Sequence, residues 1–375
     1  MSTRELLSSL NPLAGDDSRA AATASVSALS GNRPVLLVQS GRAGLRLALS
    51  RVKRASGRVA VPAYTCPVVI EAAMAAGFDV DLVDVNYETL EMDEAALDRM
   101  VPRPDAVVPV HLFGDPVQVG RLRSKPWTVI EDCAQALGAK NAGRNVGTEG
   151  DYAVFSFGIG KVVGPGIGGA VGMPPGEVEE RPPIASGGVA LGLRAAFWSA
   201  GMKFGATTLY SLAKPFLDSR NKGEDERQLD RIRSHACKRE PPRSLPSGVC
   251  DALQSHLGKV DQVVQTRRKN AAALCEMLRD AGVSYGLSAQ ALDQSSIFTR
   301  FVIRLRPERL EDAKVALFKS GIECETPYSR VLSRLIAVGP FEGSRRLLSE
   351  SLSIPVHHLV SNRLGQISEI VARAA

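Results

Sequence analysis

The residues best placed to do chemistry surround Lys161, the single amine in a run of small and apolar residues. An apolar segment over residues 152–157 ends at Gly158, and residues 169–171 resume the apolar course after the lysine. This order predicts a strand, a loop that carries one amine, and a second strand. A lysine in such a loop, with no carboxylate beside it, is suited to forming a Schiff base with a carbonyl compound. The alternative is an ordinary surface lysine on a hairpin.

Two phosphate-binding motifs in this segment fail on inspection. Residues 164–169 match G-x-G-x-x-G, but the following Ala-Val-Gly-Met-Pro-Pro cannot begin the helix that a dinucleotide motif requires. Gly160 and Lys161 resemble the end of a P-loop, yet Phe155 stands where that motif needs its first glycine. Neither match indicates a nucleotide site.

Polar groups also follow two other predicted strands. Asp132 comes directly after the strongly apolar residues 127–130, where a carboxylate must be paired or hydrogen bonded; capping a helix is the alternative. Residues 35–38 run into Gln-Ser-Gly-Arg at 39–42, and helical spacing of apolar residues begins at Leu45. A strand, a small-residue turn and a helix start would direct backbone N–H groups at an anion such as phosphate, unless this is only an ordinary capped helix.

Strands and helices alternate through the first half of the chain. We expect strands over 58–62, 80–83, 106–110 and 127–130, with helices over 68–76 and 93–100. Several of these strands are uninterrupted apolar runs, which argues for a mostly parallel sheet covered by helices on both faces. Ligands of such sheets bind beyond the carboxyl ends of the strands.

The pattern divides the chain into successive parts. We expect an N-terminal arm (1–32), a large α/β domain (33–245) with an insertion at about 177–244, and a smaller C-terminal α+β domain (246–375). The insertion contains an apolar patch over 191–217 and a charge-dense run over 220–243. The C-terminal domain is expected to begin with one long amphipathic helix over 247–281, followed by a strand near 298–305 and a helix over 308–320.

The composition is that of an ordinary globular protein: 375 residues, 44% hydrophobic and 23% charged. The net charge of +6 comes from scattered residues, so we expect an anionic small ligand and no nucleic-acid partner. The six cysteines form no C-x-x-C pair, which favours reduced thiols in the cytosol over disulfides or a zinc site. Neighbouring His357 and His358 would point to opposite sides of an extended segment, so we expect no metal there.

The sequence shows no sign of a membrane-spanning segment. The N-terminus lacks the apolar core of a signal peptide, and no stretch reaches the roughly 18 uncharged residues of a membrane span. The apolar patch over 191–217 could contact a membrane surface or a partner subunit, and core packing or a dimer contact is the favoured interpretation.

Taken in order, four motifs resemble the DegT/DnrJ/EryC1/StrS family. They are Ser40-Gly41, Pro62-Ala-Tyr-Thr, Asp132-x-Ala-Gln135 and Ser156-Phe-x-x-x-Lys161. Members are pyridoxal 5'-phosphate (PLP) enzymes of the aspartate-aminotransferase fold (fold type I), mostly aminotransferases of nucleotide-linked keto sugars. The likeness runs from about residue 35 to 171 and continues more faintly at 245–278 and 321–357.

The resemblance implies a role for each motif residue. Lys161 would hold PLP as an internal aldimine and move a proton between the donor Cα and the cofactor. Asp132 would pair with the pyridine nitrogen and keep it protonated, which makes the ring a better electron sink. Gln135 would bond the phenolic oxygen, and Ser156 with the Gly41-Arg42 backbone would cradle the phosphate.

Three positions depart from the family pattern. Cys66 stands where members commonly have an aromatic residue that stacks on the cofactor, and Arg42 stands where they usually have threonine. Phosphate contact at Arg42 could therefore involve its guanidinium. The family's Asn-Tyr-Arg segment, which reaches the neighbouring subunit's cofactor, has no clear counterpart around residues 242–244.

The activity that the resemblance implies is transfer of an amino group from glutamate to a keto sugar nucleotide, by a homodimer in the cytosol. Presence of Lys161 favours this over dehydration or epimerisation of a sugar, because the family's dehydratases lack the lysine. A third hypothesis is a non-catalytic scaffold that binds a partner or a membrane through the apolar patch.

Overall fold

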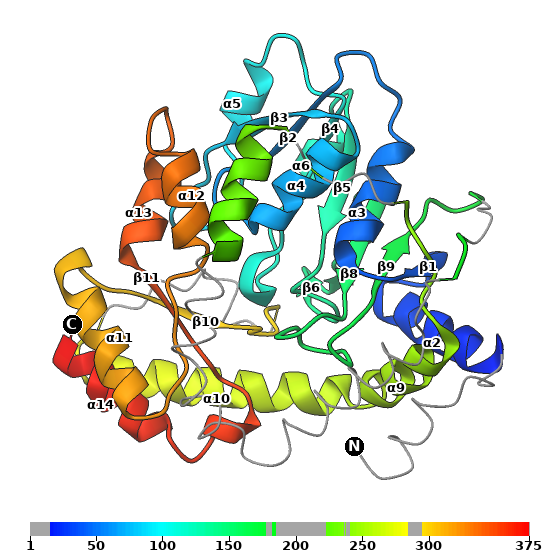
Figure 1. Cartoon of the computed structure of the whole chain (residues 1–375). Helices are drawn as coiled ribbons and strands as arrows, with labels where there is room; N and C mark the ends of the chain where they lie inside the picture. Colours follow the sequence, from blue (N-terminus) through cyan, green and yellow to red (C-terminus); the bar gives the residue numbers. More distant parts are fainter. Residues whose placement is uncertain are drawn as a thin grey trace.

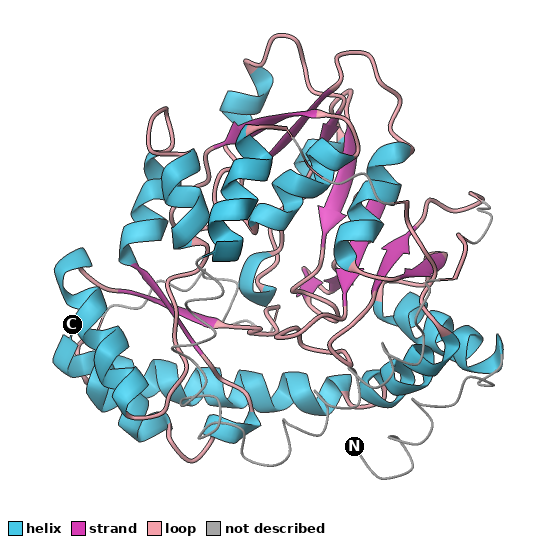
Figure 2. Ribbon diagram, viewed as in Figure 1, coloured by secondary structure: helices cyan, strands magenta, loops and turns pink. Residues whose placement is uncertain are grey.

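The computed structural model describes residues 16–177, 182–184, 223–235, 237, 241–283 and 295–374 (Figures 1 and 2). The apolar patch over 191–217 and most of the expected insertion lie outside these residues. In the part of the chain that is described, no helix has both the length and the apolar character needed to cross a membrane.

A seven-stranded sheet forms the centre of the molecule, in the order β1-β9-β8-β5-β4-β2-β3. Its strands are β1 Val35–Val38, β2 Arg58–Pro62, β3 Asp79–Val83, β4 Ala106–Val107, β5 Thr128–Asp132, β8 Tyr152–Ser156 and β9 Gly169–Gly172. The pairs from β3 to β8 are parallel, while β9 is antiparallel to both β8 and β1. The expected mostly parallel sheet is therefore confirmed.

Helices cover both faces of this sheet (Figure 1). They are α2 Asp16–Leu29, α3 Gly41–Ser50, α4 Pro67–Ala75, α5 Glu94–Asp98, α6 Gly120–Arg123 and α9 Ser247–Leu257. Successive strand residues point to opposite faces. Val154 joins the buried cluster of α3 and α4, whereas Phe155 joins that of α2 and α9. Likewise Val61 faces α3 and α4, and Ala60 packs with α5 and α6.

The expected strand over 106–110 is shorter than predicted. Pro109 has no N–H to donate to a neighbouring strand, which ends regular pairing after Val107. The Pro109 carbonyl still accepts the Asp132 N–H at 2.9 Å. The segment then turns through a 3-10 helix, η1 Leu112–Gly114, that passes beside the end of β5.

The prediction of one helix over 247–281 is wrong, because two helices fill this range. α9 ends at Leu257, and α10 Val260–Asp280 begins after Gly258 and Lys259. Glycine is a poor residue for a helix interior, and the break lets the two helices follow different neighbours. α9 packs on α2, while α10 reaches the C-terminal helices (Figure 1).

The C-terminal residues build a second, smaller sheet and core. The antiparallel strands β10 Phe301–Arg304 and β11 Ser351–Ile354 pack with the second half of α10. The other elements are α11 Pro307–Lys319, α12 Ser329–Leu335, α13 Glu342–Glu350, η3 His358–Val360 and α14 Leu364–Ala374. A small hairpin, β6 Lys140–Asn141 and β7 Arg144–Asn145, lies between β5 and β8 in the chain.

Candidate active site

Asp132 and Lys161 lie at the same edge of the large sheet. Asp132 is the last residue of β5 and is paired in register with Val154 of the parallel strand β8. β8 ends at Ser156, and the loop that follows carries Lys161. The positive charge of Lys161 acts on the Asp132 carboxyl group and offsets part of the pKa increase caused by burial. The paired strands β5 and β8 therefore carry the carboxylate and the loop of the amine to the same edge of the sheet.

The loop around Lys161 is closed by short contacts that demand glycine. Gly158 forms a bridge with Gly166, and the Lys161 N–H donates to the Gly158 carbonyl at 3.3 Å. A Cβ on Gly164, whose φ is +149°, would lie 2.2 Å from the Phe157 carbonyl oxygen. The many small residues of this segment are thus explained by a tight turn that presents the lysine.

The Asp132 side chain is buried with little compensation. It is 6% exposed, and its one hydrogen bond among the described residues comes from the Ala134 N–H at 2.9 Å. Burial raises the pKa of Asp132. A buried carboxylate in this situation gains most from a cationic hydrogen-bond donor, and a protonated pyridine nitrogen is such a donor. The residue therefore fits the ring-nitrogen end of PLP.

Gln135 lies in a turn after β5. Its Oε1 accepts the Phe113 N–H at 3.2 Å, and its Nε2 donates to the Tyr328 hydroxyl at 2.7 Å. The Thr299 hydroxyl donates to the backbone carbonyl of Gln135 at 2.5 Å. Gln135 is thus held by η1 and by two segments of the C-terminal part.

Gly41 and Ser156 are brought together at the start of α3. A Cβ on Gly41 would lie 2.9 Å from the Ser156 Cβ, so position 41 has no room for a side chain here. Ser40 is the N-cap of α3, and its Oγ accepts the Ala43 N–H at 3.1 Å. The capped-helix interpretation is correct for Ser40, and the helix end beside Ser156 retains N–H groups that suit an anion.

The guanidinium of Arg42 lies against Glu71 of α4, at 3.3 Å. Glu71 is buried, and it also accepts hydrogen bonds of 2.9 Å from Arg231 and from Gln228, both in a helix over residues 223–233. Arg42 is half exposed. Its side chain is therefore paired with a carboxylate, whereas the Ser156 Oγ accepts only a long hydrogen bond of 3.4 Å from the Gly158 N–H among the described residues.

Cys66, the position that departs from the family pattern, faces this same site. Burial raises the pKa of its thiol, and the charges of Lys161 and Arg42 act in the opposite direction. Tyr328 and Phe113 lie close by, with ring centroids 6.3 Å apart and an interplanar angle of 18°. The sequence analysis missed both aromatic residues, because neither belongs to a motif and they are distant in the chain.

A buried charge cluster stabilises the end of β5. Glu131 bonds the His111 ring at 3.1 Å and accepts backbone N–H groups of Gly147, Glu149 and Gly150. Although burial opposes it, these hydrogen bonds hold the pKa of Glu131 below its usual value. With Cys133 the cluster resembles a metal site. Both His111 nitrogens and both carboxylate oxygens already have protein partners, however, so a structural role accounts for it.

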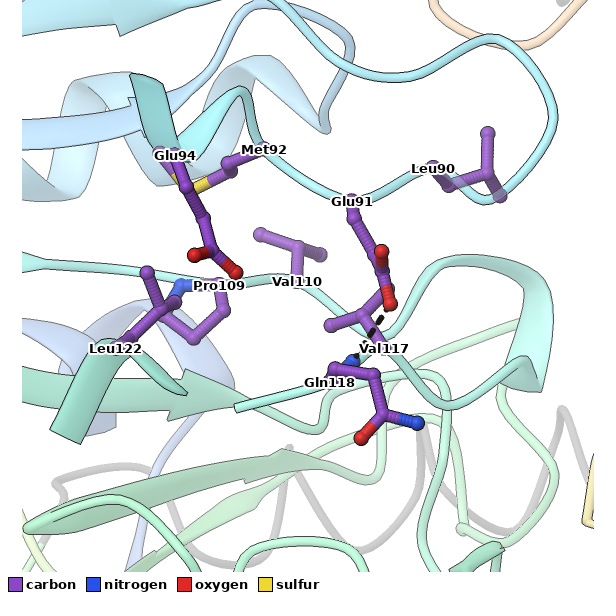
Figure 3. A pocket seen from close by; sticks show the side chains of 9 residues that line it. All are labelled: Leu90, Glu91, Met92, Glu94, Pro109, Val110, Val117, Gln118 and Leu122. Carbon is purple, nitrogen blue, oxygen red and sulfur yellow. Dashed lines mark hydrogen bonds between the residues drawn. The ribbon is translucent and has the colours of Figure 1, made fainter. Parts of the chain in front are cut away.

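Two cavities lie away from this site, and neither is lined by Asp132 or Lys161. Figure 3 shows the smaller one, about 10 Å³, where the Gln118 N–H donates to Glu91 at 3.2 Å. It has room for no more than one water molecule. The other, about 500 Å³, lies between the β6–β7 hairpin and the start of α10, with Lys140 and Arg268 in its wall.

Comparison with known proteins agrees with this arrangement. Residues 5–186 match the DegT/DnrJ/EryC1/StrS aminotransferase family. The chain is 36% identical over 165 residues to a UDP-N-acetyl-3-dehydro-alpha-D-glucosamine 3-aminotransferase of Acidithiobacillus ferrooxidans, which covers 42% of this chain and 45% of that protein. It therefore spans less than half the length of that relative.

A second relative matches over more of its length. The dTDP-3-amino-3,4,6-trideoxy-alpha-D-glucose transaminase of Micromonospora megalomicea is 28% identical over 337 residues, which covers 85% of this chain and 79% of that protein. A DegT DnrJ EryC1 StrS aminotransferase from Brucella abortus shares the fold, with a TM-score of 0.72 and 20% identity over 98% of this chain and 94% of that one. Residues 5–186 thus match the DegT/DnrJ/EryC1/StrS aminotransferase family by sequence, and the chain shares the fold of a solved aminotransferase of that name.

Proposed function

We propose that this protein is a PLP-dependent aminotransferase that moves an amino group, with glutamate as donor, to a keto sugar nucleotide. The observation that carries the proposal is that the buried carboxylate of Asp132 ends β5 at the edge of the sheet where the neighbouring strand β8 leads into the loop of Lys161. A single flat cofactor would use both groups if its carbonyl carbon reached the Lys161 amine and its basic ring nitrogen reached the Asp132 carboxylate.

Each residue has a task that its surroundings support. When bound, PLP supplies a conjugated ring that takes up the electron pair left at the donor Cα. Asp132, held by the Ala134 N–H, would keep a proton on the ring nitrogen. Lys161 would hold the cofactor and carry a proton to and from Cα, a double task that a single amine on a glycine-rich loop can perform.

The phosphate would lie at the start of α3. The Ser156 hydroxyl and the N–H groups of Gly41 and Arg42 supply donors there, and the absent side chain of Gly41 leaves the approach open. The Arg42 guanidinium is paired with Glu71. We therefore infer that the backbone N–H of Arg42 binds the phosphate, and that the charge of its side chain contributes only in part.

The acceptor class is inferred from the relatives, whose names include nucleotide-linked amino sugars. We also propose a homodimer in the cytosol, with a large domain over 33–245 and a smaller one over 246–375. The residues that contact the substrate are not assigned.

The test starts from purified protein reconstituted with PLP. An absorption band near ~420 nm is expected for a lysine-bound cofactor. Lys161→Ala should lose this band and reduce transamination at least ~100-fold, the scale of one general acid-base group. Lys140→Ala, which removes an exposed lysine of β6, should change neither. Transamination by Lys161→Ala at the wild-type rate would sink the mechanism.

The acceptor is identified by offering a panel of nucleotide keto sugars and other carbonyl compounds together with glutamate. Formation of an amino product that requires glutamate supports transamination. Conversion of a sugar without glutamate would instead support the dehydratase or epimerase alternative.

A further inference from the structure

Two aromatic residues hold the side-chain amide of Gln135 from its two ends. The Phe113 N–H donates to Oε1, and Nε2 donates to the Tyr328 hydroxyl. A backbone N–H can only donate, so Oε1 is the atom that faces Phe113 and Nε2 the atom that faces Tyr328. The Phe113 N–H therefore identifies the oxygen end of the amide, and the Tyr328 hydroxyl holds the nitrogen end.

This arrangement leaves two hydrogen-bond donors next to each other. Nε2 carries two protons, and Tyr328 accepts one of them. The Tyr328 hydroxyl keeps its own proton, and among the described residues its hydrogen bond to Gln135 is the only one found. Burial raises the pKa of Tyr328 well above its usual value, so the hydroxyl stays protonated. Two neutral donors at one point suit an anionic oxygen.

Both aromatic residues have a backbone conformation that large side chains rarely adopt. Phe113 has φ 60° and ψ 7°, and Tyr328, at the start of α12, has φ 61° and ψ 2°. Their rings lie nearly parallel, and Tyr64 meets Tyr328 edge-on at 5.7 Å. Left-handed backbone at non-glycine residues persists only where the surroundings impose it, and such residues concentrate at functional sites.

The same cluster borders the position at which the chain departs from its family. Cys66 packs against the buried cluster that includes Tyr64 and Phe113, with Tyr328 beside it. The thiol also acts electrostatically on the Tyr328 hydroxyl. The Tyr328 ring therefore lies next to Cys66, which has no aromatic ring of its own.

We propose that Tyr328 is a further cofactor-binding residue, which orients the Gln135 amide and donates its own hydroxyl proton to the phenolic oxygen of PLP. Its ring, stacked on Phe113, adds aromatic surface on the side where Cys66 supplies none. The inference rests on the proposed function, because it takes PLP as the ligand.

The experiment measures the PLP dissociation constant and the pH dependence of the cofactor absorption band. Tyr328→Phe should raise the dissociation constant about threefold to tenfold, the range for one hydrogen bond. It should also raise the pH midpoint of the band, because fewer donors stabilise the anionic oxygen. Tyr328→Leu, which removes the ring as well, should raise the dissociation constant further.

A double-mutant cycle separates action through Gln135 from an independent effect. Tyr328→Phe should raise the PLP dissociation constant by a smaller factor in a Gln135→Ala background than in the wild type, because part of its effect passes through the Gln135 amide. Equal increases of the dissociation constant in the two backgrounds would contradict the orienting role of Tyr328.

Tyr87→Phe is the matched control, since the Tyr87 hydroxyl also has a single partner, Glu350, outside the site. It should leave both cofactor readouts unchanged. A Tyr328→Phe protein with lowered thermal stability but wild-type affinity and band profile would make Tyr328 a structural residue, and the inference wrong. Failure of the wild-type protein to bind PLP would instead reject the proposed function, and this inference with it.

Discussion

Gln135, in the turn after β5, donates a hydrogen bond of 2.7 Å to the hydroxyl of Tyr328, 193 residues further along the chain. The Thr299 hydroxyl adds a second contact to the carbonyl of the same residue. Asp84, after β3, accepts the N–H groups of Gly343 and Ser344 at the start of α13. The edge of the large sheet and the C-terminal part are therefore joined by polar contacts, and the geometry of the site depends on both.

Asp132→Asn should stabilise the cofactor-free protein while impairing the enzyme. Burial raises the pKa of Asp132, so the folded state binds more protons than the unfolded chain above the usual value of 3.8. The protein therefore loses stability as the pH rises above 3.8. The asparagine amide does not ionise, so the variant avoids that loss. We expect a higher Tm at pH 7 and turnover reduced about 100-fold.

Thermal denaturation from pH 3 to pH 8 measures the first effect. The gain should shrink as pH falls and vanish below 3.8, where Asp132 becomes neutral in both states. Asp98→Asn, at a half-exposed residue of α5, is the control and should show little change. A variant that is less stable than the wild type at pH 7 would contradict the account.

Glu71→Gln should loosen the helix over residues 223–233. The variant removes the charge that faces Arg42 and Arg231, and a buried carboxylate with three partners contributes more than a surface pair. Because both arginines remain partly exposed, we expect a loss of about 2 kcal/mol in the free energy of unfolding.

Chemical denaturation measures that loss, and limited proteolysis reports whether the helix detaches. Glu224→Gln removes an exposed partner of the same Arg231 and should cost under about 0.5 kcal/mol. Equal losses in the two variants would show that burial of Glu71 is unimportant.

Gly169→Ala should destabilise the junction between β9 and α3. A Cβ at this position would lie 2.5 Å from the Gly41 nitrogen and 2.5 Å from the Ser40 carbonyl carbon, so the backbone would have to move. Overpacking of this kind costs about 1–3 kcal/mol, and displacement of the helix start should also weaken PLP binding.

Gly365→Ala is the control for that substitution. Its Cβ would meet no atom of the described residues within 4 Å, and the residue is the second of α14. We expect it to stabilise the protein by about 0.5–1 kcal/mol, since alanine is the better helix residue. Urea titration of both variants tests the pair, and a stabilising Gly169→Ala would refute the close approach.

His357 should make the protein lose stability in mild acid. Burial, followed by the charges of Arg267, His358 and Arg300, lowers the pKa of His357 to about 4. The unfolded chain therefore binds more protons below pH 6.5, and stability falls as pH drops from there to about 4. The loss is at most about 3 kcal/mol. His357→Gln should flatten the Tm profile between pH 4 and 6.5 and leave its slope at pH 8 unchanged.

The sequence determined those elements whose signals are local. Short apolar runs bracketed by turn residues predicted β1 and β2 with the bounds observed, and the small-residue turn after residue 38 indicated that a helix follows. Alternation of strands and helices implied parallel pairing. The sequence placed Asp132 at a strand end, and the family resemblance implied that Asp132 and Lys161 would meet the same cofactor.

Tertiary structure alone decided the contacts between distant segments. No local pattern indicates that Glu71 binds Arg42 or that Phe113 and Tyr328 hold Gln135. These contacts depend on how the C-terminal part packs against the sheet, an arrangement stabilised by many weak interactions across the chain. Neighbouring residues therefore encode the catalytic groups, and the packing of remote segments determines the surroundings in which those groups act.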